Sequence, residues 1–538
     1  MFEKLNEQLN QLFKKKEAVK EGKKEETVFK IDFSSNQKTV NFPESEDKSK
    51  IDFRYPLIIP YAYSHIVWDE VQSELIYKIE EPILDQREKE TLVMLEQGVK
   101  EFINMSFIAV KEKETLIEFL EKNVQVLLRE LNIDLDKNSY LKIMYYIYRD
   151  FIGLNKIEPL MNDIYIEDIE CNGKNSPVYI VHRRYGNIRT NIVYKDFDEL
   201  TSFVEKLAQK CGRFISYSTP IVDGVLPSGD RVNATYTEDV SSKGPTFTLR
   251  KFSREPWSPM KLMQAGSISP EILAYLWLLV ENGSNILVVG GTGSGKTSFI
   301  NGLAFFIPPE DRIVSIEDSR EIRLEHENWL PSVARAGIGA GEEKAGEVTM
   351  FDLLRSSFRQ RPDYIIVGEI RGQEANVLFQ AMAAGHASMA TMHANDVKTV
   401  IRRLQTPPIN LSPSLVEILD VICLMTFAKI KGADRRKLSA IQEILSVSEG
   451  GNAVVNVPFK WDPMNDVFLF KKQSNIFDKI VIKKGISIDR LWKEFDIRKK
   501  LLIEMYRKKI FEFSEVQKII HAYYRTPQKV LKEFGLIK

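Results

Sequence analysis

The chain has 538 residues, of which 43% are hydrophobic and 28% charged, a composition typical of a folded globular protein and not of a disordered or collagen-like chain. This length exceeds what one hydrophobic core supports, so we expect roughly two to four domains. Lys plus Arg and Asp plus Glu are equal at 75 each, so the overall charge favours neither nucleic acid nor an acidic partner.

The three cysteines, Cys171, Cys211 and Cys423, lie far apart and lack the spacing of zinc ligands. We interpret them as reduced, mostly buried thiols of a cytoplasmic protein. The longest apolar run, Ile272 to Val280, is roughly half the length that crosses a bilayer. We therefore expect a cytoplasmic chain without a secretory signal, which associates with the inner face of the membrane peripherally, through partners.

The first residues are rich in Lys, Glu, Asn, Gln and Ser, which together bury little apolar surface. Apolar residues between Phe2 and Phe13 share one helical face and precede three lysines. This pattern fits an amphipathic arm for an anionic membrane surface or a partner helix, and equally a frayed solvated tail. We predict a flexible charged arm over residues 1–48.

The next region combines helical patterning, as in Arg87 to Leu131, with strand-like runs such as Val178 to Val181. We interpret residues 49–255 as an α+β N-terminal domain. Its division near residue 150 is left open.

Two arginines of this region follow tight turns and strand-like runs, Arg231 in LPSGDRVNA and Arg250 in TFTLRKF. Arginines presented from a rigid hairpin can reach the γ-phosphate in a neighbouring subunit. The alternative is a surface ion pair with Asp230 or Glu238. The residues by themselves favour the ion pair.

A linker is predicted over residues 256–262, which read PWSPMKL, and a nucleotide domain over residues 263–450. In this domain Asn285 to Phe299 reads NILVVGGTGSGKTSF and fits the phosphate-binding pattern GxxxxGK[ST]. An apolar run, Ile286 to Val289, precedes the glycines, and apolar residues at helical spacing follow them. This order of strand, loop and helix argues against a glycine-rich turn that binds nothing.

In such a loop the backbone N–H groups face phosphate oxygens, and the following helix adds the positive end of its dipole. We expect the Lys296 ammonium to contact the β- and γ-phosphates and the Thr297 hydroxyl to bind Mg2+. The residues predicted to bind the nucleotide are Gly291, Thr292, Gly293, Ser294, Gly295, Lys296, Thr297 and Ser298.

Carboxylates follow two further predicted strands of this domain. The strand Arg312 to Ile316 leads to Glu317 and Asp318, and the strand Tyr364 to Val367 leads to Glu369. Ligands of open α/β sheets bind at the carboxyl ends of the strands, so these acids should face the nucleotide. We expect Glu369 to hold Mg2+ directly or through water.

A fourth predicted strand, Ala387 to Met392, brings His393 to the same edge of the sheet. A single histidine in such a place is more often structural than catalytic. His393 would be the third polar group delivered there, so we favour a catalytic role. Arg371, in the sequence EIR, fits either a phosphate sensor or a bonded partner of the acids. Residues 451–538 are predicted to form a helical C-terminal appendage without chemistry of its own.

Four motifs follow one another in the chain: GGTGSGKT, IVSIEDSREIRL, RPDYIIVGEIRG and AGHASMATMHAND. In these motifs the chain resembles the secretion ATPases of type II and type IV systems, which include the motors of type IV pili and of the archaellum. The segments IEPLMNDIYIEDIECNG, LPSGDRVNATYT and HAYYRTPQKVL resemble the archaeal branch, most of all the archaellum motor ATPase and next the archaeal pilus assembly ATPases. The four-cysteine zinc module of bacterial relatives is missing, in agreement with that branch.

The resemblance implies an α/β fold with a RecA-like C-terminal ATPase domain, whose sheet is rich in parallel strands, and an α+β N-terminal domain on a flexible linker. It also implies a homo-hexameric ring with nucleotide at the subunit interfaces. Glu317 would be the base or water-orienting acid, Glu369 the Walker B acid and His393 the histidine-box residue. Arg231 and Arg250 match the family's N-terminal arginines that approach the nucleotide.

The family further implies ATP as substrate, Mg2+ as cofactor and a polytopic membrane platform protein as partner, with an accessory cytoplasmic ATP-binding protein as a further one. We therefore predict a hexameric motor that hydrolyses ATP to assemble or rotate an archaeal pilus-like filament, or to drive related secretion. One alternative is a pilus assembly or secretion ATPase without a rotary role. Another is a RecA-like nucleic-acid translocase, against which the balanced charge argues.

Overall fold

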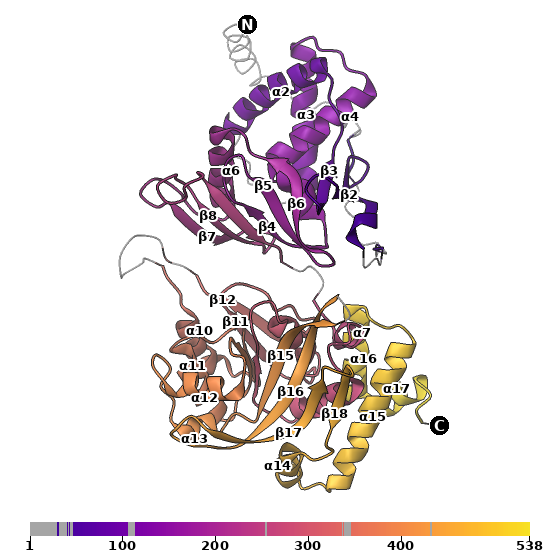
Figure 1. Cartoon of the computed structure of the whole chain (residues 1–538), viewed down its shortest axis with the longest axis vertical. Helices are drawn as coiled ribbons and strands as arrows, with labels where there is room; N and C mark the ends of the chain where they lie inside the picture. Colours follow the sequence, from indigo (N-terminus) through magenta and orange to yellow (C-terminus); the bar gives the residue numbers. More distant parts are fainter. Residues whose placement is uncertain are drawn as a thin grey trace, which may run out of the picture. The chain divides into compact units, whose positions relative to one another are not determined.

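The computed structural model describes residues 29–31, 40, 42–43, 47–105, 113–252, 256–335, 337, 346–430 and 433–537. The chain divides into two compact units, Met1–Phe252 and Ser253–Lys538 (Figure 1). The apolar face predicted between Phe2 and Phe13 lies outside the described residues.

The N-terminal unit contains a nine-stranded sheet in the order β1-β2-β3-β6-β5-β4-β9-β8-β7. Strands β3 and β6 pair in parallel, and the other pairings between its described strands are antiparallel. The strands are β1 (Asp52–Ile58), β2 (Ala62–Asp69), β3 (Glu74–Glu80), β4 (Ile166–Cys171), β5 (Pro177–His182), β6 (Gly186–Val193), β7 (Ile221–Val225), β8 (Arg231–Thr235) and β9 (Thr246–Arg250).

Helices α2, α3 and α4 of this unit pack together (Figure 1), and α6 contacts β8. The buried face of α6 consists of apolar residues three or four positions apart, and the side chain of Asp196 caps its first turn. The helices are η3 (Lys48–Lys50), α2 (Gln86–Met105), α3 (Lys113–Glu130), α4 (Lys137–Ile147), η4 (Tyr148–Ile152), η5 (Asn155–Ile157), α5 (Glu158–Asn162) and α6 (Phe197–Lys210).

Two aromatic residues of the predicted charged arm contact the folded part of the N-terminal unit. Phe29 is buried, and its backbone N–H donates to the Glu121 carboxylate over 3.0 Å. The Phe42 ring meets the rings of Tyr55 and Tyr165 edge to face. Phe29 belongs to the apolar cluster of the N-terminal unit and Phe42 packs against it, so both aromatic side chains bury apolar surface there.

The C-terminal unit contains a second nine-stranded sheet in the order β12-β11-β13-β14-β10-β15-β16-β17-β18. The pairings from β12 to β15 are parallel, and those from β15 to β18 are antiparallel. The strands are β10 (Ile286–Val289), β11 (Ile313–Glu317), β12 (Trp329–Val333), β13 (Tyr364–Val367), β14 (Ala387–Met392), β15 (Val421–Ile430), β16 (Ala433–Val447), β17 (Ala453–Asp462) and β18 (Val467–Phe470).

Both faces of the parallel strands are buried. Along β10, Ile286 and Val288 belong to one apolar cluster, whereas Leu287 and Val289 belong to another. Successive side chains of a strand point to opposite faces, so this alternation places helices on both sides of the sheet. The first cluster contains residues of α8, α9 and the C-terminal helices, and the second contains residues of α11 and α12.

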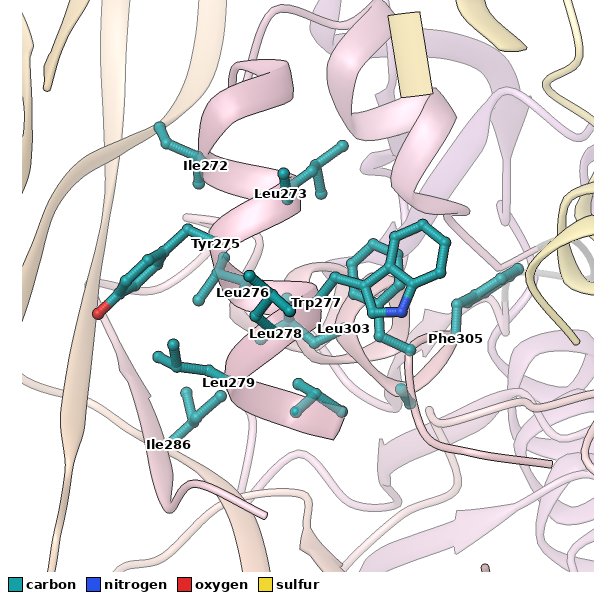
Figure 2. Packing of buried hydrophobic residues seen from close by; sticks show 14 of the residues in the cluster. Ile272, Leu273, Tyr275, Leu276, Trp277, Leu278, Leu279, Ile286, Leu303 and Phe305 are labelled. Atoms are coloured by element: carbon teal, nitrogen blue, oxygen red, sulfur yellow. The ribbon is translucent and has the colours of Figure 1, made fainter. Parts of the chain in front are cut away.

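Helix α8 is the most deeply buried helix of the first cluster, and Figure 2 shows Trp277 on it beside Leu303 and Phe305. The Trp277 ring stacks on Phe306 with centroids 4.9 Å apart, and its indole N–H donates to the Tyr524 hydroxyl. The helices are α7 (Pro259–Gln264), α8 (Pro270–Glu281), α9 (Lys296–Ala304), α10 (Met350–Ser357), η6 (Phe358–Gln360), α11 (Glu374–Ala383), α12 (Val397–Gln405), α13 (Pro413–Val416), α14 (Asn475–Lys484), α15 (Ile488–Arg507), α16 (Phe513–Arg525) and α17 (Pro527–Glu533).

The predicted appendage over residues 451–538 is not wholly helical, because β17 and β18 extend the central sheet. The helices α15 and α16 then return to the same apolar cluster as α8, so the segment is part of the nucleotide domain's core. The predicted linker is also partly helical, since α7 begins at Pro259 with its first turn capped by the Ser258 side chain. The predicted fold class is confirmed: an α+β N-terminal domain is followed in the chain by an α/β domain whose sheet is rich in parallel strands.

Candidate active site

The glycine loop connects β10 to α9 along the carboxyl edge of the parallel strands. Gly293 has a φ of 71° and Gly295 a φ of 90°, both in the left-handed region that glycine adopts without strain. Gly295 caps α9, whose first residue is Lys296. The predicted loop residues therefore lie at a helix N-terminus, where unpaired backbone N–H groups and the helix dipole favour an anion.

Gly290 closes the base of this loop against β15. A Cβ atom on Gly290 would lie 2.5 Å from the Met425 carbonyl oxygen and 2.5 Å from the Ser294 Oγ. The Ser294 hydroxyl in turn donates to the Gly291 carbonyl over 2.8 Å. The loop therefore packs closely against β15, and the Ser294 hydrogen bond stabilises its conformation. No side chain fits at position 290.

Lys296 is 8% exposed, and its ammonium is held by the loop itself. Its Nζ donates to the carbonyl oxygens of Gly290 and Gly291 over 3.1 and 2.9 Å. Burial lowers the pKa of Lys296 from its usual value, and the negative charge of Glu369 acts in the opposite direction. A cation in this place lies within the loop that would receive phosphate oxygens.

His393 links Lys296 to Glu369. Its Nδ1 lies 3.3 Å from the Lys296 Nζ, and its Nε2 lies 3.2 Å from the Glu369 Oε1. An ammonium has only hydrogens to donate, so Nδ1 accepts and the ring proton sits on Nε2, facing the carboxylate. Burial, followed by the charge of Lys296, lowers the pKa of His393, which favours this neutral form.

Glu369 follows β13 and stays ionised. Its Oε2 accepts a hydrogen bond from the Arg371 guanidinium over 2.7 Å. Burial raises the pKa of Glu369, but the hydrogen bond from Arg371 and the charges of Arg371 and Lys296 outweigh it, so the pKa is lowered. Of the two roles that the sequence left open for Arg371, the structure shows the bonded partner.

Glu317 ends β11 and is 1% exposed. Its Oε1 accepts from the backbone N–H groups of Glu321 and Ile322, each over 2.8 Å, and its Oε2 is buried without a hydrogen-bond partner among the described residues. Burial raises the pKa of Glu317 to about 7, although the two backbone hydrogen bonds act to lower it. A carboxyl group with a pKa near neutrality is suited to accept and release a proton.

Gly368, the residue before Glu369, lies against the Glu317 side chain. A Cβ atom on Gly368 would lie 3.1 Å from the Glu317 Cγ, so the two acidic strand ends are adjacent. The Thr391 hydroxyl donates to the Gly368 carbonyl over 2.6 Å and fixes β14 at the same point. The structure therefore brings Lys296, His393 and Glu369 into one bonded chain, with Glu317 beside it.

Sequence reasoning missed Asn301, which supports Glu317 from α9. The Asn301 Oδ1 accepts from the Arg323 backbone N–H over 3.1 Å, and its Nδ2 donates to the Glu321 carbonyl over 3.3 Å. It thereby holds the segment whose N–H groups bond Glu317. A buried polar residue on an otherwise apolar helix face was the available signal.

Sequence reasoning also missed Arg436 of β16. Its Nε donates to the Gly293 carbonyl over 2.9 Å, so a strand on the far side of β10 contacts the glycine loop. No local pattern marks this arginine among its charged neighbours.

A cavity of about 270 Å³ lies beside the chain of bonded groups, lined by Glu369, Arg371, His393 and Arg403. A larger hollow of about 880 Å³ lies over α10 and α11, and none of the predicted site residues lines it. The smaller cavity therefore adjoins the candidate chemistry, and the larger one does not.

Arg231 and Arg250 lie in the N-terminal unit, opposite each other on β8 and β9. The Arg231 guanidinium forms an ion pair with Asp223, at 2.8 Å, and Arg250 forms one with Asp168, at 2.9 Å. The predicted partner Asp230 instead accepts from the Ser228 hydroxyl and the Phe252 backbone N–H. Each arginine thus forms an ion pair with a carboxylate on a neighbouring strand.

Within the described part of the chain, no group of three or more His, Cys, Asp and Glu side chains is arranged to hold a metal ion by itself. The candidate ligands Thr297 and Glu369 would therefore hold Mg2+ together with phosphate oxygens and water, as is usual for this ion. Every helix in the described residues is too short or too polar to cross a membrane.

A buried strand, a glycine loop closing on a helix, and acidic residues after neighbouring parallel strands define a phosphate-loop protein of the α/β class. The chain belongs to the type II/IV secretion system protein family, whose model matches residues 152–428.

The uncharacterized protein MJ0900 of Methanocaldococcus jannaschii is 39% identical over 388 residues, which are 71% of this chain and 70% of that protein. The type IV secretion system protein PtlH of Bordetella pertussis is 31% identical over 274 residues, which are 44% of this chain and 79% of PtlH. Among solved structures, the ATPase DotB of Legionella pneumophila is similar with 16% identity and a TM-score of 0.37, over 67% of this chain and 93% of DotB.

Proposed function

We propose that this chain is an ATPase that hydrolyses ATP with Mg2+ and couples the reaction to filament assembly or protein secretion. The observation that carries the proposal is the bonded chain from Lys296 through His393 to Glu369, beside the buried Glu317. Family membership supports the same conclusion. A loop that only bound phosphate would not need two carboxyl groups held in such different protonation states.

In this proposal water attacks the γ-phosphate of ATP in line with the leaving group. Glu317 orients the water and takes its proton, for which a pKa of about 7 is suited. Lys296 neutralises charge that develops on the phosphate oxygens. Thr297 and Glu369 would hold Mg2+, which supplies further neutralisation when bound.

His393 contributes to this chemistry by connecting the Lys296 ammonium to the Glu369 carboxylate. As a neutral ring it accepts from Lys296 and donates to Glu369, so movement of either group changes the bonds of the other. A site that must report the presence of the γ-phosphate to the rest of the protein benefits from such a link. Asn301 and Arg371 keep Glu317 and Glu369 in place.

We further propose that the chain works as a homo-hexamer in which Arg231 and Arg250 of one subunit complete the site of the next. The motor would act on a polytopic membrane protein at the cytoplasmic face, with an accessory ATP-binding protein as a further partner. The similarity to MJ0900 supports the archaeal branch. Within that branch we place the chain with the archaellum motor or with pilus assembly ATPases on the motifs in its sequence, and no observation of the fold favours a nucleic-acid translocase.

The test is phosphate release by the purified full chain with ATP and Mg2+. We expect Lys296→Ala to abolish turnover and Glu317→Gln to lower it by about 10²- to 10³-fold while ATP binding is retained, because Glu317 acts on the water and not on the nucleotide. Glu327→Gln, an exposed carboxylate on the same stretch, is the matched control. Unchanged turnover in Glu317→Gln would contradict the assigned role, and stimulation of the wild type by single-stranded DNA would favour a translocase.

A further inference from the structure

The hairpin of β15 and β16 borders the glycine loop on the side away from the acidic residues. In the sheet, β10 lies between β14, which leads to His393, and β15. Strand β15 is still paired with β10 at Leu424, opposite Val289, and then continues past the point where the loop begins. The residues of this hairpin around Met425 and Arg436 therefore form one wall of the loop.

Two side chains of this wall share one face. Phe427 of β15 lies directly opposite Arg436 of β16 in the antiparallel register. Side chains of directly opposed residues point to the same side of a sheet, about 5 Å apart at Cβ. An aromatic ring and a guanidinium thus lie side by side next to the loop.

Arg436 places this pair against the nucleotide loop. Its Nε donates to the Gly293 carbonyl, and its Cδ is 3.3 Å from where a Cβ atom of Gly295 would be. Phe427 is nevertheless 53% exposed, although its neighbour along the same face of β15, Met425, is buried. The Phe427 ring is therefore a half-exposed flat surface beside a guanidinium that already bonds the loop. A ligand can cover such a surface.

The acids on the other side fix which part of a nucleotide comes here. Glu317, Glu369 and His393 follow β11, β13 and β14, all on one side of β10 in the sheet. The γ-phosphate must face them if they act on it. The α-phosphate, with the ribose and base that it carries, then leaves the loop on the side of β15 and β16.

We propose that Phe427 and Arg436 form the nucleobase platform of this site, on which a purine ring stacks against Phe427 with the Arg436 guanidinium at its edge. This inference rests on the proposed ATP site and adds its base recognition. A guanidinium only donates hydrogen bonds, and both adenine and guanine offer ring nitrogens that accept them. The platform therefore selects purines over pyrimidines by stacking area, and does not by itself separate adenine from guanine.

The test compares the affinities of the full chain for Mg2+-ATP, Mg2+-CTP and inorganic tripolyphosphate by titration calorimetry. In the wild type we expect ATP to bind more tightly than CTP, and CTP more tightly than tripolyphosphate. Phe427→Ala should lower ATP affinity about tenfold and leave tripolyphosphate affinity unchanged, because only the base loses its stacking partner. Phe427→Trp should restore ATP affinity.

Two control variants separate the platform from general effects on the sheet. Leu445→Ala removes a half-exposed apolar side chain at the far end of β16, and Arg435→Ala removes the cation next to Arg436 in the chain, whose side chain points to the other face. Neither variant should change any of the three affinities. Arg436→Ala should weaken ATP binding more than tripolyphosphate binding.

Equal loss of ATP and tripolyphosphate affinity in Phe427→Ala would overturn the platform, and so would an unchanged ATP affinity. A wild-type chain that binds tripolyphosphate as tightly as ATP overturns the platform alone, because the phosphate site would still stand. A wild-type chain that binds neither compound overturns the proposed function and the platform together.

Discussion

His393 is the residue on which the two charged halves of the site depend, because one ring nitrogen bonds Lys296 and the other bonds Glu369. Replacing it by alanine removes the hydrogen bonds that position the Lys296 ammonium and the Glu369 carboxylate. We therefore expect turnover to fall by about 10²-fold while ATP affinity changes little. Steady-state kinetics with a separate binding measurement tests this.

His386 is the matched control, since it immediately precedes the same strand and its Nδ1 bonds only the Pro362 carbonyl in the described structure. His386→Ala should keep most of the turnover. If His393→Ala weakens ATP binding as strongly as it lowers turnover, the ring holds nucleotide and does not link the two charges during catalysis.

The buried carboxyl of Glu317 should make stability depend on pH. The unfolded chain releases this proton near the ordinary pKa of 4.5, whereas the folded chain keeps it until about pH 7. The folded state therefore binds more protons between these values, and stability falls as the pH rises from 4.5 to 7 and then levels off. Glu317→Gln removes the titration, so from pH 5 to pH 8 the free energy of unfolding of the variant should rise relative to that of the wild type by on the order of 3 kcal/mol.

Calorimetry of the wild type and the variant at the two pH values measures this difference. A gap that stays constant with pH would mean that Glu317 ionises at its ordinary pKa despite its burial.

Sequence reasoning located residues of this site but not their supports. Glu317 ends a strand, and Glu369 and His393 follow one within two residues, so the carboxyl edge of the sheet gathers these three side chains. Lys296 reaches the same edge at the start of the helix that follows the glycine loop. Asn301 was not predicted, because its contacts join α9 to a segment about twenty residues later. Such contacts follow from tertiary packing and have no periodicity in the chain.

At the scale of elements, the close contact between the glycine loop and β15 should make Gly290 intolerant of any side chain. Its Cβ would lie 2.5 Å from a backbone carbonyl oxygen, that of Met425, which cannot move without breaking the strand pairing. We expect Gly290→Ala to cost about 1–3 kcal/mol of stability and to abolish ATP binding. Thermal unfolding and calorimetric titration measure the two effects.

Gly450 offers a control in the same unit, because the nearest atom to its Cβ position is the Asn452 Nδ2 at 3.7 Å. Gly450→Ala should leave both measurements unchanged. Normal ATP binding by Gly290→Ala would show that the loop can move away from β15 and that the cradle is not fixed by the sheet.

The parallel strands were predictable and the last antiparallel ones were not. The strands β10, β13 and β14 have the bounds expected from the sequence, because every position in them is buried and their residues are apolar or small. The strands β17 and β18 have half-exposed faces, and the helical patterning that follows them predicts helix for the whole region. An edge strand of this kind is recognised by its pairing partner, which lies elsewhere in the chain.

At the scale of the whole molecule, the two arginines raise the question of whether a site belongs to one chain or two. Arg231 and Arg250 lie in a different compact unit from Lys296. Each is held by a carboxylate on a neighbouring strand, so neither arginine needs a phosphate to be stable in the free unit. An anion that recruits them must therefore compete with Asp223 and Asp168, which suits contacts made only at one stage of a cycle.

Mixing inactive subunits distinguishes the two arrangements. One variant, Lys296→Ala, keeps its arginines, and the other, Arg231→Ala with Arg250→Ala, keeps its loop. If a neighbour supplies the arginines, a ring made from equal amounts of both contains some interfaces with an intact loop and intact arginines. At random these are about a quarter of all interfaces, so mixed rings should regain about a quarter of the wild-type turnover.

Co-expression of the two variants, followed by phosphate-release assays on the purified mixture, provides the measurement. If each chain uses its own arginines, no chain in the mixture is complete and turnover stays at the level of the single variants. A mixture of Lys296→Ala with a chain carrying all three substitutions must also stay inactive, since no loop in it is intact. Recovery in the first mixture but not in the second would therefore assign the arginines to the neighbouring subunit, and with them the interface as the place where hydrolysis is controlled.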